Sequence, residues 1–170
     1  MNQLPYIPSE LRNQRRLLAC LSLFSLALIG AALYLQFYQR ADPCPLCILQ
    51  RYAYWLIAFF TLFGATARSA SILRLAQILT LIAAASGMIA VGRQLWLLAH
   101  PFLSCGFDAL EPILDKLPLA KSLPFMFKVA GLCESTNIPV LGLPLPAWSL
   151  IGYLVIFGLV SYSFSKKITT

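Results

Sequence analysis

Residues 17–35, LLACLSLFSLALIGAALYL, run for 19 residues without a charged side chain. At 1.5 Å of rise per residue, a helix of this length measures about 28 Å, which matches the hydrocarbon thickness of a bilayer. Arg12, Arg15 and Arg16 precede it, a pattern shared by signal peptides and membrane anchors. Because the apolar run exceeds the roughly 7 to 15 residues of a signal-peptide core, we interpret it as a retained membrane-spanning helix.

Three further apolar stretches follow along the chain. Residues 47–66 hold one charged side chain, Arg51, residues 75–98 hold only Arg93, and residues 146–164 hold none. We therefore expect an all-α membrane protein, a single domain of residues 1–170 folded as a four-transmembrane-helix bundle. Its predicted spans are about 17–37, 47–66, 75–98 and 146–164. An even number of spans places both termini on the same side of the membrane.

Two predicted loops share the opposite side, a short first loop of about residues 38–46 and a long second loop of about residues 99–145. The long loop is too polar and too rich in proline to span a membrane. Its prolines are Pro101, Pro112, Pro118, Pro124, Pro139 and Pro144. Residues 125–129 and 138–145 are nevertheless apolar enough for us to expect them against a membrane surface.

The composition excludes an ordinary water-soluble domain. The chain is 59% hydrophobic and 11% charged, whereas soluble domains have about 25% charged residues. Its net charge of +7 would indicate a nucleic-acid surface in a polar protein. Here the charges are sparse and scattered, and an excess of Lys and Arg is typical of the cytoplasmic flanks of membrane spans. We therefore predict no nucleic-acid partner.

The distribution of Lys and Arg predicts the orientation in the membrane. On the side of the termini lie Arg12, Arg15, Arg16, Arg68, Arg74, Lys166 and Lys167, and on the opposite side lie Arg40, Arg51, Arg93, Lys116, Lys121 and Lys128. The short flanks are more informative, because three arginines precede the first span whereas Arg40 in the first loop lies beside Asp42. By the positive-inside rule we expect both termini cytoplasmic and both loops outside.

Four of the five cysteines lie on the predicted outer face of the membrane. Cys44 and Cys47 form a C-x-x-C motif at the edge of the second span, and Cys105 and Cys133 lie in the long loop. Cys20 is inside the first span, where we interpret it as a small apolar side chain. The C-x-x-C spacing is typical of thiols that cycle between dithiol and disulfide, because the partner thiol is always within reach.

The cysteines allow two other interpretations, structural disulfides and a zinc site. A structural bridge from Cys105 to Cys133 would close a loop of about 29 residues and contribute roughly 3.5 kcal/mol, but structural disulfides explain the C-x-x-C poorly. Structural zinc usually takes two closely spaced pairs of ligands, and only one pair is close in this sequence. We therefore predict no metal.

The start of the second span gives Cys47 a specific environment. If the helix begins near Cys47, unpaired backbone N–H groups and the helix dipole favour its thiolate. Arg51 lies four residues on, and therefore on the same helical face. Two interpretations of Arg51 stay open at this point. It either extends to lipid headgroups, or it polarises a bound electron acceptor and stabilises the anion formed there.

These motifs together resemble the bacterial inner-membrane disulfide bond formation protein B family, DsbB. The resemblance rests on PCPLCILQR at residues 43–51, Cys105 and Cys133 in a long second loop, LPL at 117–119, and LGLPLPAW at 141–148. With the four-span layout it covers nearly the whole chain.

The resemblance implies an electron relay in the bacterial inner membrane. In this relay the reduced periplasmic thiol oxidase DsbA attacks a Cys105–Cys133 disulfide, and Cys105 forms the mixed disulfide. Electrons then pass to Cys44 and Cys47, and from Cys47 to a membrane quinone, ubiquinone or menaquinone. The implied catalytic residues are Cys44, Cys47, Cys105 and Cys133, and the implied quinone-binding residues are Cys47, Arg51 and Gln94.

The sequence departs from the family pattern at two positions. Some members have a His near the outer end of the third span, where this chain has Arg93 and Gln94; Gln94 can donate a hydrogen bond to a quinone carbonyl but cannot titrate. Members also commonly carry an acidic residue before the last cysteine, where this chain has Leu132.

Two alternative functions remain beside this one. A membrane redox enzyme like the vitamin K epoxide reductases has similar parts, although those enzymes generally place the C-x-x-C after the loop pair. A non-catalytic scaffold with structural disulfides predicts inert cysteines.

Overall fold

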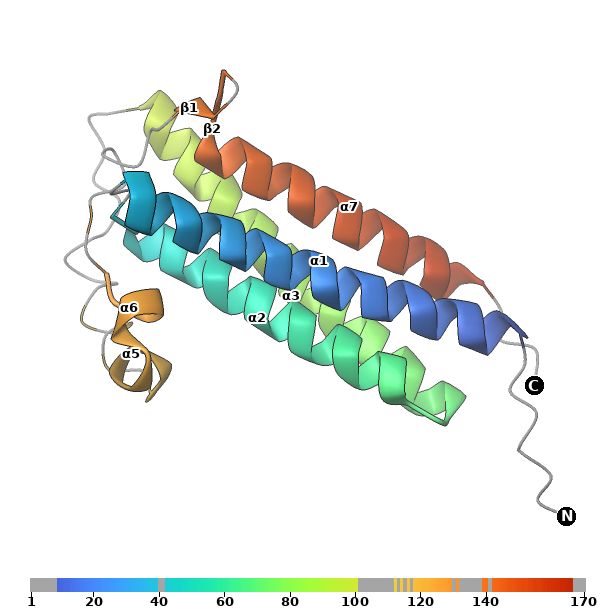
Figure 1. Cartoon of the computed structure of the whole chain (residues 1–170). Helices are drawn as coiled ribbons and strands as arrows, with labels where there is room; N and C mark the ends of the chain where they lie inside the picture. Colours follow the sequence, from blue (N-terminus) through green and yellow to red (C-terminus); the bar gives the residue numbers. More distant parts are fainter. Residues whose placement is uncertain are drawn as a thin grey trace, which may run out of the picture.

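The computed structural model describes residues 9–39, 42–100, 118–129, 139–140 and 142–166, together with positions 112, 114, 116 and 131. Four long helices dominate it (Figure 1): α1 Ser9–Gln39, α2 Pro45–Thr66, α3 Ala70–Ala99 and α7 Leu145–Ser165. All four are long and apolar enough to cross a membrane. The predicted helical bundle is therefore confirmed, and α1 and α3 begin earlier than expected because their polar flanks continue the helix.

The four helices pack in an open order. Helix α2 packs extensively on both α1 and α3, and α3 also packs extensively on α7, whereas α1 and α7 make few direct contacts. The start of α1 and the end of α7 lie at one end of the bundle, and the short elements of the second loop lie at the other (Figure 1). The α1–α7 seam is consequently the most loosely packed of these four neighbouring contacts.

Two tyrosines fill the centre of the bundle between α2 and α7. The rings of Tyr54 and Tyr153 stack with their centroids 4.2 Å apart. A Cβ atom at Gly87 would overlap the ring of Tyr153, and one at Gly152 would lie 2.6 Å from the hydroxyl of Tyr54. Close approach of the helices at these tyrosines therefore requires glycine at both positions.

Arginines bond to helix ends at the other extremity of the bundle. Nε of Arg15 donates to the carbonyl oxygen of Ala65 at 2.7 Å, and Nη1 of Arg74 donates to that of Phe164 at 3.0 Å. These carbonyls belong to the last turns of α2 and α7, where no further turn of helix supplies an N–H donor. The same arginines that predict orientation thus also satisfy the helix C-termini.

The described part of the second loop contains two short helices, α5 Pro118–Ser122 and α6 Pro124–Phe127. Met126 and Phe127 of α6 are buried, and the Phe127 ring lies 4.5 Å from that of Tyr52 on α2. Val129 is buried too, whereas Phe125 and Lys128 are exposed. The expectation that residues 125–129 rest on a membrane surface is therefore wrong for most of them, because they pack on the helices of the bundle.

A small hairpin that the sequence analysis did not predict leads into α7. Strand β1 Pro139–Val140 pairs antiparallel with β2 Leu143–Pro144. Gly142 occupies the turn with a φ of 82°, a conformation that glycine adopts without steric cost. The hairpin fixes where the last long helix begins.

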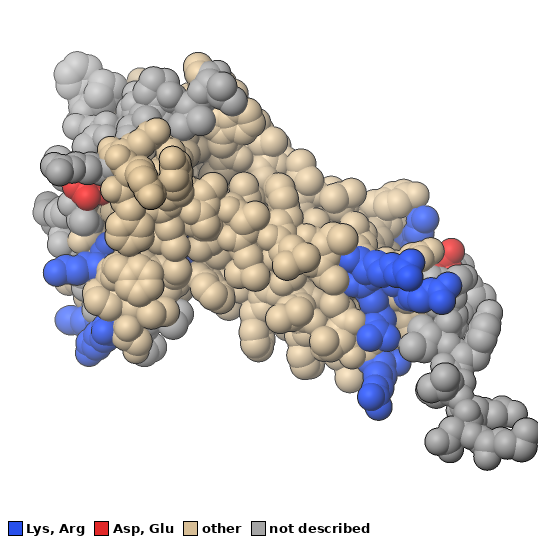
Figure 2. Space-filling view, viewed as in Figure 1, with Lys and Arg blue, Asp and Glu red and all other residues tan. Residues whose placement is uncertain are grey.

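The surface agrees with a membrane setting. Lys and Arg gather towards the two ends of the molecule, and the band between them is free of charge on the face shown (Figure 2). Large apolar side chains are exposed along the helices, including Leu23, Phe59, Ile82, Ile89 and Leu154. An apolar belt of this extent is expected where helices face lipid.

Candidate redox site

The C-x-x-C motif forms the first turn of α2. Cys44 is the N-cap residue and its Sγ accepts a hydrogen bond from the backbone N–H of Cys47 at 3.3 Å. Pro45 follows at the first helical position, where its fixed φ and missing N–H cost nothing. We expected the helix to begin near Cys47 and its N–H groups to face that sulfur. The helix begins at Pro45, two residues before Cys47, and the backbone N–H of Cys47 donates to the sulfur of Cys44.

The two motif sulfurs are in contact as free thiols. Sγ of Cys44 lies 2.9 Å from Sγ of Cys47, with Cys44 fully buried and Cys47 partly exposed. Two effects chiefly raise the pKa of the Cys44 thiol well above its ordinary value: the hydrogen bond with Cys47, which is the larger, and burial. The Cys44 thiol is therefore held in its protonated form, in contact with the sulfur of Cys47.

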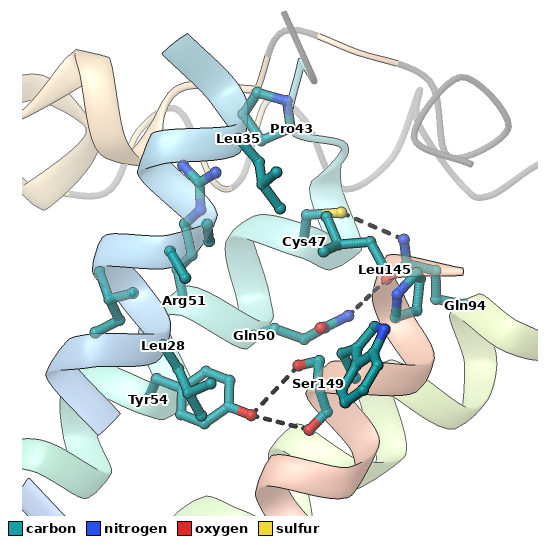
Figure 3. Close-up of a pocket in the computed structure, with 15 residues that line it drawn as sticks. Leu28, Leu35, Pro43, Cys47, Gln50, Arg51, Tyr54, Gln94, Leu145 and Ser149 are labelled. Carbon is teal, nitrogen blue, oxygen red and sulfur yellow. Dashed lines mark hydrogen bonds between the residues drawn. The ribbon is translucent and has the colours of Figure 1, made fainter. Parts of the chain in front are cut away.

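Two glutamines extend this network towards α3. Nε2 of Gln94 donates to Sγ of Cys47 at 3.3 Å, and Nε2 of Gln50 donates to Oε1 of Gln94 at 2.6 Å (Figure 3). Gln94 is completely buried and Gln50 is 7% exposed. The structure thus places Gln94, a predicted site residue, beside the cysteine pair.

Arg51 is buried within the protein. Its Nη1 donates to Oε1 of Gln36 at 2.8 Å and to the carbonyl oxygen of Met126 at 2.7 Å. Gln36 in turn donates to the carbonyl of Phe125 at 3.0 Å. The guanidinium is therefore hydrogen-bonded to α1 and α6. It does not extend to lipid headgroups.

A cavity of about 230 Å³ adjoins these side chains. Cys47, Gln50, Arg51 and Tyr54 of α2 contribute to it, with Gln94 from α3 (Figure 3). The remaining wall is mostly apolar and comes from α1, from Pro43 in the first loop and from the start of α7; it comprises Leu28, Ile29, Ala31, Ala32, Leu35, Pro43, Leu145, Pro146, Trp148 and Ser149. The cavity therefore combines the Cys47 sulfur and a few polar side chains with a mostly apolar wall, and it borders the loosely packed α1–α7 seam.

The structure does not describe every predicted site residue. Cys105 and Cys133 fall outside the described residues. Cys20 is exposed on α1 and does not line the cavity. Gly131, however, is described, and its backbone N–H donates to the carbonyl of Pro43 at 3.2 Å. The second loop therefore contacts the first loop next to Cys44.

Sequence reasoning missed Gln36, Gln50 and Tyr54. A signal existed for Gln50, because an amide inside an apolar span is costly unless it has a specific partner. Within the part of the chain that the structure describes, no group of three or more His, Cys, Asp or Glu side chains is placed to hold a metal ion.

The fold and the site define a class, that of four-helix membrane proteins with a cysteine pair beside an apolar cavity. The family model of disulfide bond formation protein DsbB matches residues 14–163. Disulfide bond formation protein B of Burkholderia pseudomallei (strain 1106a) is 48% identical over 147 residues, 86% of this chain and 87% of the relative. Disulfide bond formation protein B 1 of Pseudomonas entomophila (strain L48) is 43% identical over 155 residues, 91% and 90% of the two chains.

The chain belongs to the DsbB family. It is accordingly a thiol:quinone oxidoreductase of disulfide bond formation in the bacterial inner membrane.

Proposed function

We propose that the chain takes electrons from a reduced DsbA-type periplasmic thiol oxidase and delivers them through Cys44 and Cys47 to a membrane quinone. One observation carries the proposal: Cys47 contacts the sulfur of Cys44 at 2.9 Å and also lines the cavity. A single sulfur is thereby in reach of both the thiol side and the acceptor side of the reaction.

The cavity suits the ring of ubiquinone or menaquinone. Its volume of about 230 Å³ lies below the roughly 300–1,000 Å³ of pockets that enclose whole drug-sized ligands, so a ring fits and a long apolar tail stays outside. The loose seam between α1 and α7 offers a lateral path from lipid. Arg51 and Gln94 line the cavity with Cys47 and supply N–H groups where charge develops on the acceptor.

The chemical step balances at the cysteine pair. Two electrons and two protons leave the thiols of Cys44 and Cys47, an S–S bond forms between them, and the quinone is reduced to the quinol. The proton held on Cys44, whose pKa is raised, leaves as the disulfide closes. Reduced DsbA then reduces a Cys105–Cys133 disulfide, and the resulting dithiol reduces the Cys44–Cys47 disulfide by exchange.

Contact between the loops supports the exchange. Gly131 is bonded to Pro43, the residue before Cys44. One residue, Leu132, separates Gly131 from Cys133 in the sequence. The second loop is therefore held beside Cys44 at Gly131, two positions before Cys133 in the sequence.

The orientation follows from charge. Arg12, Arg15 and Arg16 precede the apolar part of α1, and the positive-inside rule assigns such a flank to the cytoplasm. Both loops then face the periplasm, where a DsbA-type partner works. DsbA is a strong oxidant with a reduction potential of about −120 mV, whereas the potential of the glutathione pool is roughly −220 to −260 mV. A membrane quinone is sufficiently oxidising to accept its electrons, and glutathione disulfide is not.

The test mixes the purified protein with reduced DsbA and a soluble quinone analogue and follows the quinone absorbance. The wild-type protein should reduce the quinone in step with DsbA oxidation, and Cys47→Ser should abolish the reaction. Cys20→Ser is the matched control, since Cys20 does not line the cavity, and should retain activity. Absence of wild-type reduction, or full activity of Cys47→Ser, would contradict the proposal and favour a scaffold with inert cysteines.

A further inference from the structure

We infer that Gln50 is a positioning residue: it holds the side-chain amide of Gln94 with its NH2 group towards Cys47, so that this sulfur is solvated by N–H donors when it becomes an anion. The inference deepens the proposed function and rests on it, because it takes Cys47 as the sulfur that reacts with the acceptor.

A side-chain amide has two unlike ends. Its NH2 group donates and its oxygen accepts, while a thiolate only accepts. A half-turn of the terminal torsion of Gln94, which has a broad two-fold profile, would therefore replace attraction to Cys47 by repulsion. Something on the far side must select one orientation, and the hydrogen bond of 2.6 Å from Nε2 of Gln50 to Oε1 of Gln94 does so.

The nitrogen of the Gln94 amide lies within hydrogen-bonding distance of both sulfurs. Nε2 lies 3.3 Å from Sγ of Cys47 and 3.6 Å from Sγ of Cys44. The resemblance to the DsbB family assigned Gln94 to a quinone carbonyl. In the structure Gln94 lines the cavity and also contacts the cysteine pair, where it can donate to whichever sulfur carries charge.

Gln50 is itself held in place. Its backbone carbonyl accepts a hydrogen bond of 2.8 Å from the hydroxyl of Tyr153, a fully buried residue of α7. Its side chain is 7% exposed and crosses from α2 to Gln94 on α3. In such an apolar enclosure a hydrogen bond is electrostatically stronger than in water. Three helices thus contribute to fixing one amide group.

The test measures how fast Cys47 is alkylated in reduced protein that contains neither quinone nor DsbA. The background is Cys44→Ser, which removes the competing thiol and leaves a hydroxyl that can still cap α2. Iodoacetamide is the reagent, mass spectrometry quantifies each cysteine, and the rate at Cys20 serves as the internal reference for reagent access.

Gln50→Met removes the donor while keeping a side chain of similar length. Alkylation of Cys47 relative to Cys20 should become about three- to tenfold slower, the effect of one hydrogen bond that orients a donor. Gln94→Leu, which removes the donor to sulfur outright, should slow alkylation at least as much. Gln50→Glu should do so too, since its carboxylate draws the Gln94 NH2 group away and also repels a thiolate.

Gln77→Met is the matched control. Gln77 is a fully buried glutamine on α3, bonded to Ser163 near the other end of the bundle, and its variant should leave Cys47 alkylation unchanged. Circular dichroism verifies that each variant is helical; if Gln50→Glu does not fold, Gln50→Met decides. Wild-type alkylation rates in folded Gln50→Met would overturn the inference. Because the assay contains no quinone, that result is distinct from a failure of quinone reduction.

Discussion

Nη1 of Arg51 lies 2.7 Å from the backbone carbonyl oxygen of Met126, so a charged side chain of α2 holds a short helix of the second loop against the bundle. Trp55 reinforces this contact, because its Nε1 lies 3.2 Å from Sδ of Met126. One guanidinium thereby joins the cavity wall to the loop through which electrons are expected to arrive.

Arg51→Ala should weaken both functions of this side chain. Loss of the donors to Gln36 and Met126 should cost about 1–3 kcal/mol of local stability and speed proteolytic cleavage near α6, while the KM for a quinone analogue rises about tenfold. Gln36→Leu is the control, since it loosens α6 and leaves the guanidinium in the cavity wall. If Gln36→Leu raises the KM as much as Arg51→Ala, the arginine acts on the acceptor only through the position of α6.

Gly131→Ala should slow electron transfer between the loops. A Cβ atom at Gly131 would lie 2.5 Å from the carbonyl oxygen of Asp42, so the backbone contact with Pro43 must open. We expect about a tenfold slower reduction of the Cys44–Cys47 disulfide by reduced DsbA in rapid-mixing measurements. Gly158→Ala on α7 meets open space and should react at the wild-type rate. Equal rates for the two variants would show that the loop contact does not limit transfer.

Cys133→Ala should trap the partner. Without Cys133 to re-form the loop disulfide, Cys105 cannot be released from its mixed disulfide by that route, and an adduct with DsbA should accumulate on a non-reducing gel. The adduct should vanish when Cys105→Ala is added. An adduct that persists in that double variant and disappears with Cys44→Ser would reverse the proposed order of transfer.

The raised pKa of Cys44 predicts how the stability of the reduced protein depends on pH. The unfolded chain releases this proton near the ordinary cysteine pKa of about 8.5, whereas the folded protein retains it. The stabilisation is therefore complete below about pH 8.5 and declines above it, by up to about 1.4 kcal/mol per pH unit. Thermal unfolding in detergent should show wild type losing stability relative to Cys44→Ser as pH rises from 8 to 10. Parallel curves would mean that Cys44 titrates normally.

The four long helices were predictable because each one needs only its own apolar run. Residues 17–35 specify a span whatever lies beside them, and α1 contains that stretch. The cysteine pair at the start of α2 was equally predictable from the sequence, because the C-x-x-C spacing alone brings the two sulfurs together.

Contacts between helices were not predictable in this way. Gln50 and Gln94 are 44 positions apart, and their meeting depends on the rotation of α2 against α3, which no local pattern encodes. Arg51 illustrates the same limit. Its position in the sequence allowed either headgroups or an acceptor, and the bonds to Gln36 and Met126 arise only once α1 and α6 are packed.

The stacked tyrosines make one side of the cavity harder to re-engineer than the other, which is the α1 wall. Tyr54 and Tyr153 are wedged against Gly152 and Gly87, so enlarging the cavity on that side would disturb helix packing throughout the bundle. The α1 wall presents Ala31 and Ala32 on a helix that barely touches α7. Libraries that retune the enzyme for bulkier synthetic electron acceptors should therefore vary α1 and leave the tyrosine side untouched.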